Sequence, residues 1–185
     1  LLLVSKMFAD EGIVNSLLLD LGWISQKIPF MTGPTMAKIM VLVINLWVGI
    51  PYLMLITTGV LMNIPADLYE SAKIDGASGF KQFTKITLPY MLFVTGPYLL
   101  TSFTANINNF NVIYLLTAGA PKTAAYEGGG GKTDLLITWL YSLTIEKNDY
   151  KTAAVIGILV FVVIAAISLI VYNVSPAMKN EEDFQ

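Results

Sequence analysis

Three residue types are missing from the 185-residue sequence: it contains no cysteine and no histidine, and all eleven of its basic residues are lysines. Without cysteine the chain forms no disulfide and no thiolate metal site. Without histidine it lacks the commonest general base and metal ligand, and without arginine it cannot hold phosphate bidentately. These absences argue against a catalytic residue, a metal, a cofactor or nucleic-acid binding in this chain. We therefore expect that it is not an enzyme.

Charge is also scarce, because charged residues make up 13% of the chain and hydrophobic residues 55%. The gaps between charges are long: residues 39–66, 86–121 and 152–178 hold no Asp, Glu or Lys. Each gap reaches the roughly 20 residues that a spanning helix needs, and a charge at the bilayer centre costs several kcal/mol. The sequence predicts an all-α membrane protein with spans at about residues 39–62, 88–116 and 152–174. A soluble helical protein with buried hairpins is the alternative, but helices without charge would have no solvated face.

The remaining segments are shorter and more polar. Residues 1–4 are Leu-Leu-Leu-Val, which we interpret as the end of an earlier membrane helix of a longer protein. Residues 9–38 are expected to form interfacial pieces joined by turns, and residues 117–150 a loop with a surface helix at about 134–143. Residues 179–185 are expected to be a solvated tail. Counts of lysine on the two sides of the predicted spans do not fix the orientation.

The linker at residues 65–87 has the residues of a helix-turn-helix. Pro65 suits a first helical position, Asp67 and Glu70 suit the positive start of a helix, and Gly76 suits a left-handed cap. Ser78 can cap a second helix, and Pro89 allows the next membrane helix to start. Such an element can dock on a partner, although a solvated connector would show the same helix pattern.

The linker also resembles a known motif. Its residues read Glu-Ser-Ala-Lys-Ile-Asp-Gly-Ala from position 70 and Ile-Thr-Leu-Pro from position 86. This pattern is similar to the EAA loop of the membrane (permease) subunits of ABC importers, with a serine in place of the second alanine. The resemblance implies that the loop is cytoplasmic and enters a cleft of a separate ATPase subunit. The docking residues that it implies are Glu70, Ser71, Ala72, Asp75, Gly76 and Ala77.

Other segments extend the resemblance along most of the chain. They include Trp-Val-Gly-Ile-Pro-Tyr from position 47, Asn-Asn-Phe from 108 and Thr-Ala-Gly-Ala-Pro from 117. Within the carbohydrate importers these segments are similar to the larger maltose and maltodextrin permease subunits. The resemblance implies a multi-pass protein of the prokaryotic cell membrane. Its implied partners are cytoplasmic ATP-binding subunits, a second permease subunit, an extracytoplasmic sugar-binding protein, the lipid bilayer and a neutral oligosaccharide, with no nucleic acid.

The polar residues inside the predicted spans are neutral. Ser102, Asn106 and Asn109 fall at i, i+4 and i+7, so they share one face if the helix runs to residue 116. Amides and hydroxyls are the groups that a polyhydroxylated ligand needs, and Tyr52 could add a flat surface against a sugar ring. Hydrogen bonding between helices is the alternative role of these amides.

The family resemblance implies substrate contacts at Val48, Gly49, Tyr52, Ser102, Asn106 and Asn109. One position departs from the family, because Ala105 stands where maltose permeases have an aromatic ring. The glycine run at 128–131, followed by Lys132 and Thr133, imitates a phosphate loop but lacks its first glycine, since position 126 is tyrosine.

Together these features predict a permease subunit that imports maltose or maltodextrin by alternating access, coupled to an ATPase on another chain. Two alternatives stay open. One is a permease for another neutral glycoside or oligosaccharide, and the other is a membrane scaffold subunit that does not transport.

Overall fold

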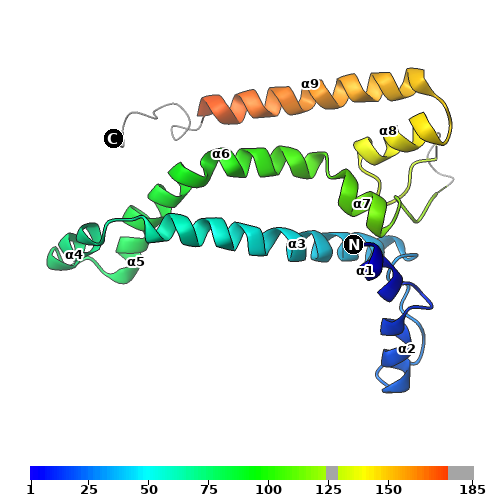
Figure 1. Cartoon of the computed structure of the whole chain (residues 1–185), viewed down its shortest axis with the longest axis horizontal. Coiled ribbons are helices and arrows are strands. Elements are labelled where there is room, and N and C mark those ends of the chain that lie inside the picture. The colour runs from blue at the N-terminus through cyan, green and yellow to red at the C-terminus, as the bar shows by residue number, and fades with distance from the viewer. Residues whose placement is uncertain (124–128, 175–185) are drawn as a thin grey trace. The chain divides into compact units, whose positions relative to one another are not determined.

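The computed structural model describes residues 1–123 and 129–174, and all regular secondary structure in this part of the chain is helical. Figure 1 labels the helices. Their bounds are α1 Leu2–Met7, α2 Ile13–Asp20, α3 Pro34–Met62, α4 Ala66–Ile74, α5 Gly79–Gln82, a π-helical turn Phe83–Thr87, α6 Leu88–Ile107, α7 Phe110–Leu116, α8 Leu136–Ile145 and α9 Tyr150–Val174. The prediction of an all-α fold is confirmed for these residues.

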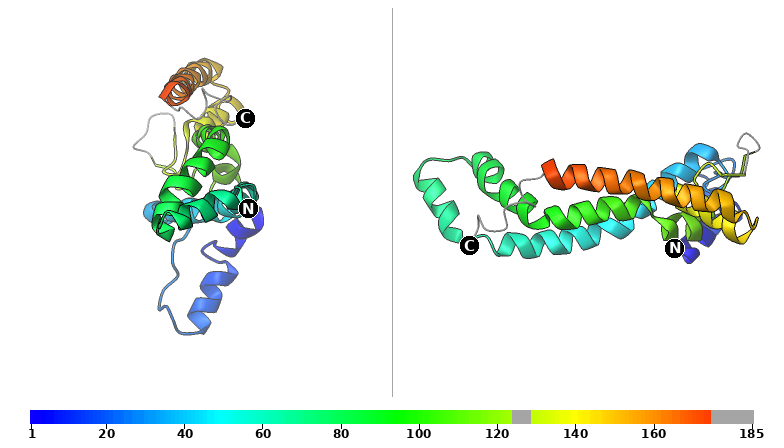
Figure 2. Two further views of the ribbon diagram at one scale, coloured as in Figure 1. Left: turned by 90° about the vertical axis from the view of Figure 1, so that its left-hand side faces the viewer. Right: turned by 90° about the horizontal axis from the view of Figure 1, so that it is seen from above.

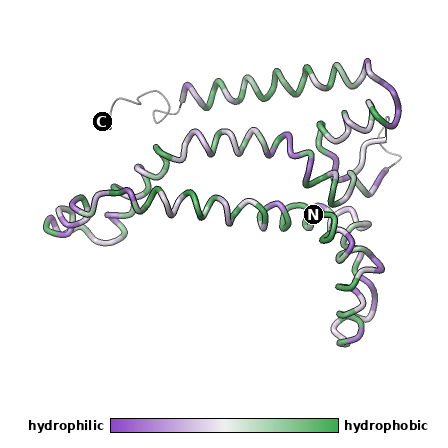
Figure 3. The backbone as a smooth tube through the Cα atoms, viewed as in Figure 1, coloured by the Kyte–Doolittle hydropathy of each residue, from purple (hydrophilic) through white to green (hydrophobic). Residues whose placement is uncertain are grey.

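Three of the described helices are long and apolar enough to cross a membrane: Pro34–Met62, Gly79–Ile107 and Tyr150–Asn173. Their most apolar windows have mean hydropathies of 2.3, 1.2 and 3.2, and at most 11% of each window is buried within the chain. Figure 3 shows the apolar residues along these helices. The prediction of three spanning helices is confirmed, and their exposed apolar surface is suited to lipid or to other membrane helices.

The second span differs from the predicted helix at 88–116. It begins earlier, at Gly79, runs through the π-helical turn and Pro89, and ends at Ile107. The chain then breaks at Asn108, and Asn109 starts the separate helix α7: its Oδ1 accepts a hydrogen bond from the Val112 N–H at 3.2 Å. An asparagine at this place caps a helix instead of continuing one, because its side chain competes for backbone N–H groups.

The described chain divides into two compact units, and the boundary falls within three helices. Unit 1 holds residues 1–48 and 106–163, and unit 2 holds residues 49–105 together with the chain from 164. The boundary lies after Val48 in α3, after Ala105 in α6 and after Val163 in α9.

Unit 1 has two apolar clusters. The first packs Met31, Met40, Ile44 and Leu116 together, and Ser5 of α1 donates a hydrogen bond to the Leu116 carbonyl at 2.7 Å. The second packs Leu143 of α8 against Ala153 and Ile156 of α9. Helix α8, at Leu136–Ile145, lies two residues later than the predicted surface helix. These clusters hold α1, α7 and the start of α3 at one place, and α8 and α9 at another.

The turn between α8 and α9 ends in a cap. Asp149 accepts a hydrogen bond from the Thr152 N–H at 3.1 Å, at the start of the third span. Hydrogen bonds from the Thr152 side chain and backbone hold the pKa of Asp149 below its usual range. The carboxylate therefore stays ionised at the positive end of α9, where a negative charge is favourable.

Unit 2 contains the predicted helix-turn-helix, with its caps where the sequence puts them. Gly76 has a φ of +72° after α4, and the Ala77 N–H donates to the Ala72 carbonyl at 2.9 Å. Ser78 caps α5 by accepting a hydrogen bond from the Lys81 N–H at 3.4 Å. Pro65 is the N-cap of α4 and not its first helical residue. The second helix does not stop at residue 87 but continues into α6.

Candidate functional site

Three asparagines of unit 1 form a hydrogen-bonded amide cluster. Asn45 of α3 donates to the side-chain oxygen of Asn106 at 2.8 Å, and Asn109 donates to the side-chain oxygen of Asn45 at 2.7 Å. Asn109 also caps α7. The cluster thus joins α3 to the end of α6 and the start of α7. Hydrogen bonding between helices was the alternative role of these amides, and the bonds show that they have it. They satisfy part of the hydrogen-bonding capacity of each amide.

The sequence did not single out Asn45, although it holds the cluster together. Its partners lie 61 and 64 residues away, so no local pattern links them. Asn109 does not extend the face of Ser102 and Asn106 as predicted, because it stands outside α6. Asn106 is exposed, while Asn45 and Asn109 are half-buried. The cluster therefore keeps an accessible edge on which hydroxyl groups could be bound.

The other predicted substrate residues divide between the units. Val48 belongs to unit 1 and is exposed. Gly49, Tyr52 and Ser102 belong to unit 2, where the Tyr52 ring lies beside that of Tyr98 with centroids 5.7 Å apart. Tyr52 remains 56% exposed, and a Cβ on Gly49 would meet no atom within 4 Å. Space for a ligand is thus open at both residues.

The predicted docking residues lie on α4 and on the turn that follows it. Glu70, Ser71, Asp75 and Gly76 are exposed, whereas Ala72 and Ala77 are half-buried beneath them. Large apolar side chains stand beside them in solvent. The exposed fractions are 47% for Leu68, 87% for Ile74, 79% for Phe80 and 48% for Phe83. This loop, residues 65–87, presents charge and apolar area on one small element, which is the composition of a protein contact.

A contact within the loop fixes its shape. The Tyr69 hydroxyl and the Thr87 hydroxyl are hydrogen-bonded at 2.8 Å, which joins α4 to the π-helical turn. The Gln82 side chain donates to the Ala77 carbonyl at 2.8 Å. The exposed side chains are therefore presented by a preformed turn, so little conformational entropy is lost on docking.

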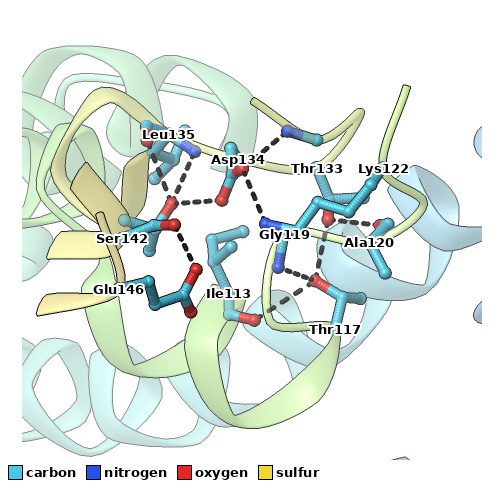
Figure 4. A network of polar contacts seen from close by, with 12 residues as sticks. Ile113, Thr117, Gly119, Ala120, Lys122, Thr133, Asp134, Leu135, Ser142 and Glu146 are labelled. Atoms are coloured by element: carbon cyan, nitrogen blue, oxygen red, sulfur yellow. Dashed lines mark hydrogen bonds and ion pairs between the residues drawn. The ribbon is translucent and has the colours of Figure 1, made fainter. Parts of the chain in front are cut away.

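A second polar group lies in the segment between α7 and α8 (Figure 4). The Asp134 side chain is only 7% exposed, and its carboxylate accepts hydrogen bonds from the Gly131 N–H at 2.6 Å and the Thr138 hydroxyl at 2.9 Å. The Lys122 ammonium lies 3.6 Å from it. Sequence reasoning missed this role of Asp134, since a lone aspartate before an apolar helix reads as a helix start.

The same segment closes through hydroxyl groups. Thr117 and Thr133 are hydrogen-bonded at 2.7 Å, and Thr133 also lies 2.7 Å from the Ala120 carbonyl. Gly119 has a φ of +78°, and a Cβ there would overlap the Asp134 carboxylate. Lys132 and Thr133, which follow the glycine run, thus belong to a loop that packs around the Asp134 carboxylate. This is not the architecture of a phosphate loop. Gly128 of that run lies outside the described residues.

Three aromatic rings of α7 and α8 pack against one another, and the first of them directly follows Asn109 in the sequence. Phe110, which follows Asn109, stacks on Tyr114 with centroids 4.9 Å apart, and Tyr141 of α8 meets both rings edge-on. A hydrogen bond with Tyr114 is the main cause that raises the pKa of the Tyr141 hydroxyl. These contacts join α7 to α8, and they position the helix that Asn109 caps.

The chain is similar to a family of membrane transport components and to several of its members. A family model described as binding-protein-dependent transport system inner membrane component matches residues 2–180. The maltodextrin transport system permease protein MdxF of Bacillus subtilis is 40% identical over 96% of this chain and 42% of the relative. The galactooligosaccharides transport system permease protein GanP of the same organism is 38% identical over 98% of this chain and 43% of the relative.

A further relative and a solved structure agree with these matches. The maltose/maltodextrin transport system permease protein MalF of Vibrio parahaemolyticus is 40% identical over 91% of this chain and 32% of the relative. A chain from a bacterial ABC transporter involved in the import of the acidic polysaccharide alginate superposes with a TM-score of 0.74 at 27% identity. That match covers 92% of this chain and 57% of the other. The chain thus spans less than half the length of MdxF, GanP and MalF.

Proposed function

The chain belongs to the inner membrane components of binding-protein-dependent transport systems, and we propose that it forms part of a permease subunit that imports maltose or maltodextrin. It is a multi-pass protein of the prokaryotic cell membrane. In this proposal it works with cytoplasmic ATP-binding subunits, a second permease subunit and an extracytoplasmic sugar-binding protein. ATP is hydrolysed on the partner chains, and this chain supplies the path for the sugar.

The preformed loop at residues 65–87 is the observation that carries the proposal. Its exposed Glu70 stands among apolar side chains that the unit leaves uncovered. A cleft on an ATPase subunit that covers this loop would bury the apolar area and pair the carboxylate with a basic group. Movement of that cleft would then pass along α4 to α3 and along α5 to α6, because both connections are short. This is a route for alternating access.

The substrate proposal rests on neutral polar groups. Charged residues are absent from positions 39–66 and 86–107, and the Asn45, Asn106 and Asn109 amides meet in unit 1. Amides bind hydroxyl groups without preferring a charged sugar. We propose that these amides, with Val48 in unit 1, contact the substrate, and that Gly49, Tyr52 and Ser102 in unit 2 do so as well. The relatives named for galactooligosaccharides and alginate make other saccharides the competing candidates.

Reconstitution of the complete importer in proteoliposomes tests the transport proposal. Uptake of labelled maltose and maltotriose, competed by a panel of galactooligosaccharides and by alginate oligomers, identifies the substrate. We expect maltodextrins to compete best. Preference for another neutral saccharide would replace maltodextrin in the proposal, and the absence of sugar-dependent ATP hydrolysis with all sugars would favour a scaffold role.

Charge reversal at Glu70 tests the docking loop. Glu70→Lys should reduce sugar-stimulated ATP hydrolysis by about tenfold or more, since a lost charge pair at an interface costs about 2–5 kcal/mol. Asp20→Lys makes the same change of charge on the exposed end of α2 and serves as the control. Unchanged coupling in Glu70→Lys would refute the docking role.

Substitution of Asn109 must separate its cap on α7 from its side-chain amide in the cluster. Asn109→Ser keeps an oxygen that can cap α7 but removes the amide that donates to Asn45, so the helix start is preserved. We expect weaker sugar uptake with unchanged assembly. Lost assembly, or normal uptake, would show that the amide cluster joins helices and does not bind sugar.

A further inference from the structure

Helix α2 has an apolar face that the chain does not cover. Ile13, Leu17 and Leu21 follow one another at i, i+4 and i+8, so they share one side of the helix. Their exposed fractions are 63%, 52% and 54%, and Trp23, just past the helix, is 74% exposed. Ser16 and Asp20 border this side and are exposed as well. The helix is therefore amphipathic on its outer surface, and the proposed transport mechanism uses none of these residues.

One buried side chain joins the two ends of the segment that carries α2. Asn15 has no exposed surface: its amide donates to the carbonyls of Asp10 at 3.3 Å and Ile28 at 2.9 Å, and its oxygen accepts the Ile28 N–H at 2.9 Å. The outgoing and returning chains are thus joined on the side of α2 opposite its apolar face. A fully satisfied buried amide fixes geometry well, so the apolar face is presented by a rigid segment.

The base of the same segment is fixed to the start of α3. The Thr32 hydroxyl donates to the Asp10 carboxylate at 2.9 Å, and the Phe8 and Phe30 rings meet edge-on with centroids 5.3 Å apart. Met31 packs with Met40 and Ile44, which belong to the first turns of α3. All of these residues lie in unit 1. The direction of α2 is therefore set relative to the part of the first span that enters the membrane.

That direction is transverse. In Figure 1 α2 lies to one side of the start of α3 and points away from it, transverse to the axis of α3, and the view along α3 in Figure 2 also shows α2 extending sideways. A spanning helix lies roughly along the membrane normal, with an average tilt of about 20°. A helix that is transverse to such a span at its start lies along the membrane surface. This is the position in which an amphipathic helix can insert its apolar side between lipid headgroups.

We propose that α2 and Trp23 form an interfacial foot, residues 13–23, which inserts into the boundary between headgroups and acyl chains beside the start of α3. The occupant of the apolar face is lipid, for three reasons. The segment leads into α3, which is long and apolar enough to cross a membrane, tryptophan prefers this boundary, and Ser16 and Asp20 leave one flank polar. The foot fixes the depth of α3 in the bilayer. This inference does not depend on the identity of the sugar.

Spin labels on single cysteines test the foot, and the sequence helps because it contains no cysteine of its own. Labels at Ile13, Leu17 and Leu21 are compared with control labels at Ser16 and Gln26, which are also exposed. The permease is reconstituted in phosphatidylcholine vesicles, alone and in the assembled importer. Collisions with oxygen report lipid, and collisions with a water-soluble nickel chelate report water.

We expect the three face positions to favour oxygen and the two control positions to favour the nickel chelate, with a depth of about 5–10 Å at the face. The pattern should be the same with and without partner subunits. Access of nickel to all five labels would overturn the proposal, because the face would then be solvated. Shielding from both reagents that arises only on assembly would also overturn it, since a protein would then cover the face.

Discussion

Residues 65–87 join α3 to α6, and residues 117–135 join α7 to α8, but the side chains of the two segments are placed in opposite ways. The first loop leaves Glu70, Ile74 and Phe80 in solvent and is held by caps and by the Tyr69–Thr87 hydrogen bond. The second surrounds the buried Asp134 with donors from its own chain. A loop whose buried polar groups form hydrogen bonds within the loop is suited to hold the helices on either side in place. A loop that leaves apolar area uncovered is suited to meet a partner.

A methyl group added at a glycine should produce the largest difference between the loops. Gly76 and Gly119 both have positive φ, +72° and +78°, so alanine strains the backbone by about 1–2 kcal/mol at either site. Only at Gly119 does the new Cβ also displace the Asp134 carboxylate, which adds about 1–3 kcal/mol. Thermal unfolding in detergent should therefore give Gly119→Ala a melting temperature well below that of Gly76→Ala. Equal melting temperatures would remove the distinction between the loops.

Neutralising one acid in each loop should give the next largest difference. Asp134→Asn replaces an acceptor by a donor that faces the Gly131 N–H or the Thr138 hydroxyl, and we expect a loss of about 1–3 kcal/mol in the free energy of unfolding. Asp75→Asn on the exposed turn should stay within about 0.5 kcal/mol of the parent. Urea unfolding of the purified variants measures both. A neutral Asp134→Asn would mean that the network does not hold the segment.

Removal of the α5 cap should give a smaller loss. Ser78→Ala deletes the oxygen that accepts the Lys81 N–H, and N-cap losses are about 1 kcal/mol. Ser78→Asp restores a capping oxygen and provides the matched control. Amide hydrogen exchange across residues 79–87 should rise in the alanine variant alone. Unchanged exchange would indicate that the Tyr69–Thr87 contact is enough to hold the turn.

Loss of an exposed ring should have the smallest effect on stability and should test whether the loop at residues 65–87 meets a partner. Phe80→Ser removes a side chain that is 79% exposed, so unfolding should change by no more than about 0.5 kcal/mol. Binding of the ATPase subunit should nevertheless weaken by about tenfold or more if the ring enters its cleft. The control Phe110→Ser, in α7, removes a ring packed against Tyr114 and Tyr141, so it should lower stability and leave binding of the ATPase subunit unchanged. Pull-down and melting experiments on the same two variants decide the point.

Local features of the fold could be predicted from the sequence because they depend on short stretches. Uninterrupted apolar runs gave the three spans, and Gly76 and Ser78 gave the caps of the helix-turn-helix. The continuation of α5 into α6 could not be predicted from Pro89, because a proline is favoured in the first turn of a helix and disfavoured inside one that has already begun. The break at Asn108 was missed for a related reason: the i, i+4 and i+7 spacing also fits a helix that stops short of its last member.

The candidate site was predictable only in part. Ser102, Asn106 and Asn109 were singled out by their chemistry, but their partner Asn45 and the burial of Asp134 depend on contacts between distant residues. No pattern within a single sequence brings such residues together. The substrate and docking roles of the predicted residues remain proposals, which sugar uptake and ATPase coupling in the variants will test.

The π-helical turn at Phe83–Thr87 has a consequence for how this sequence can vary. A π-turn corresponds to one residue inserted into an α-helix, and each residue turns the helix by about 100°. Removal of one residue between positions 83 and 87 would restore an ordinary helix and rotate Phe80 and its neighbours about the axis of α6 by that amount, while the backbone hydrogen bonds stayed complete. A one-residue gap is thus tolerable here as far as folding is concerned, but it would turn the loop away from a fixed partner. Related permeases should therefore keep the length of this turn together with the shape of the subunit it meets.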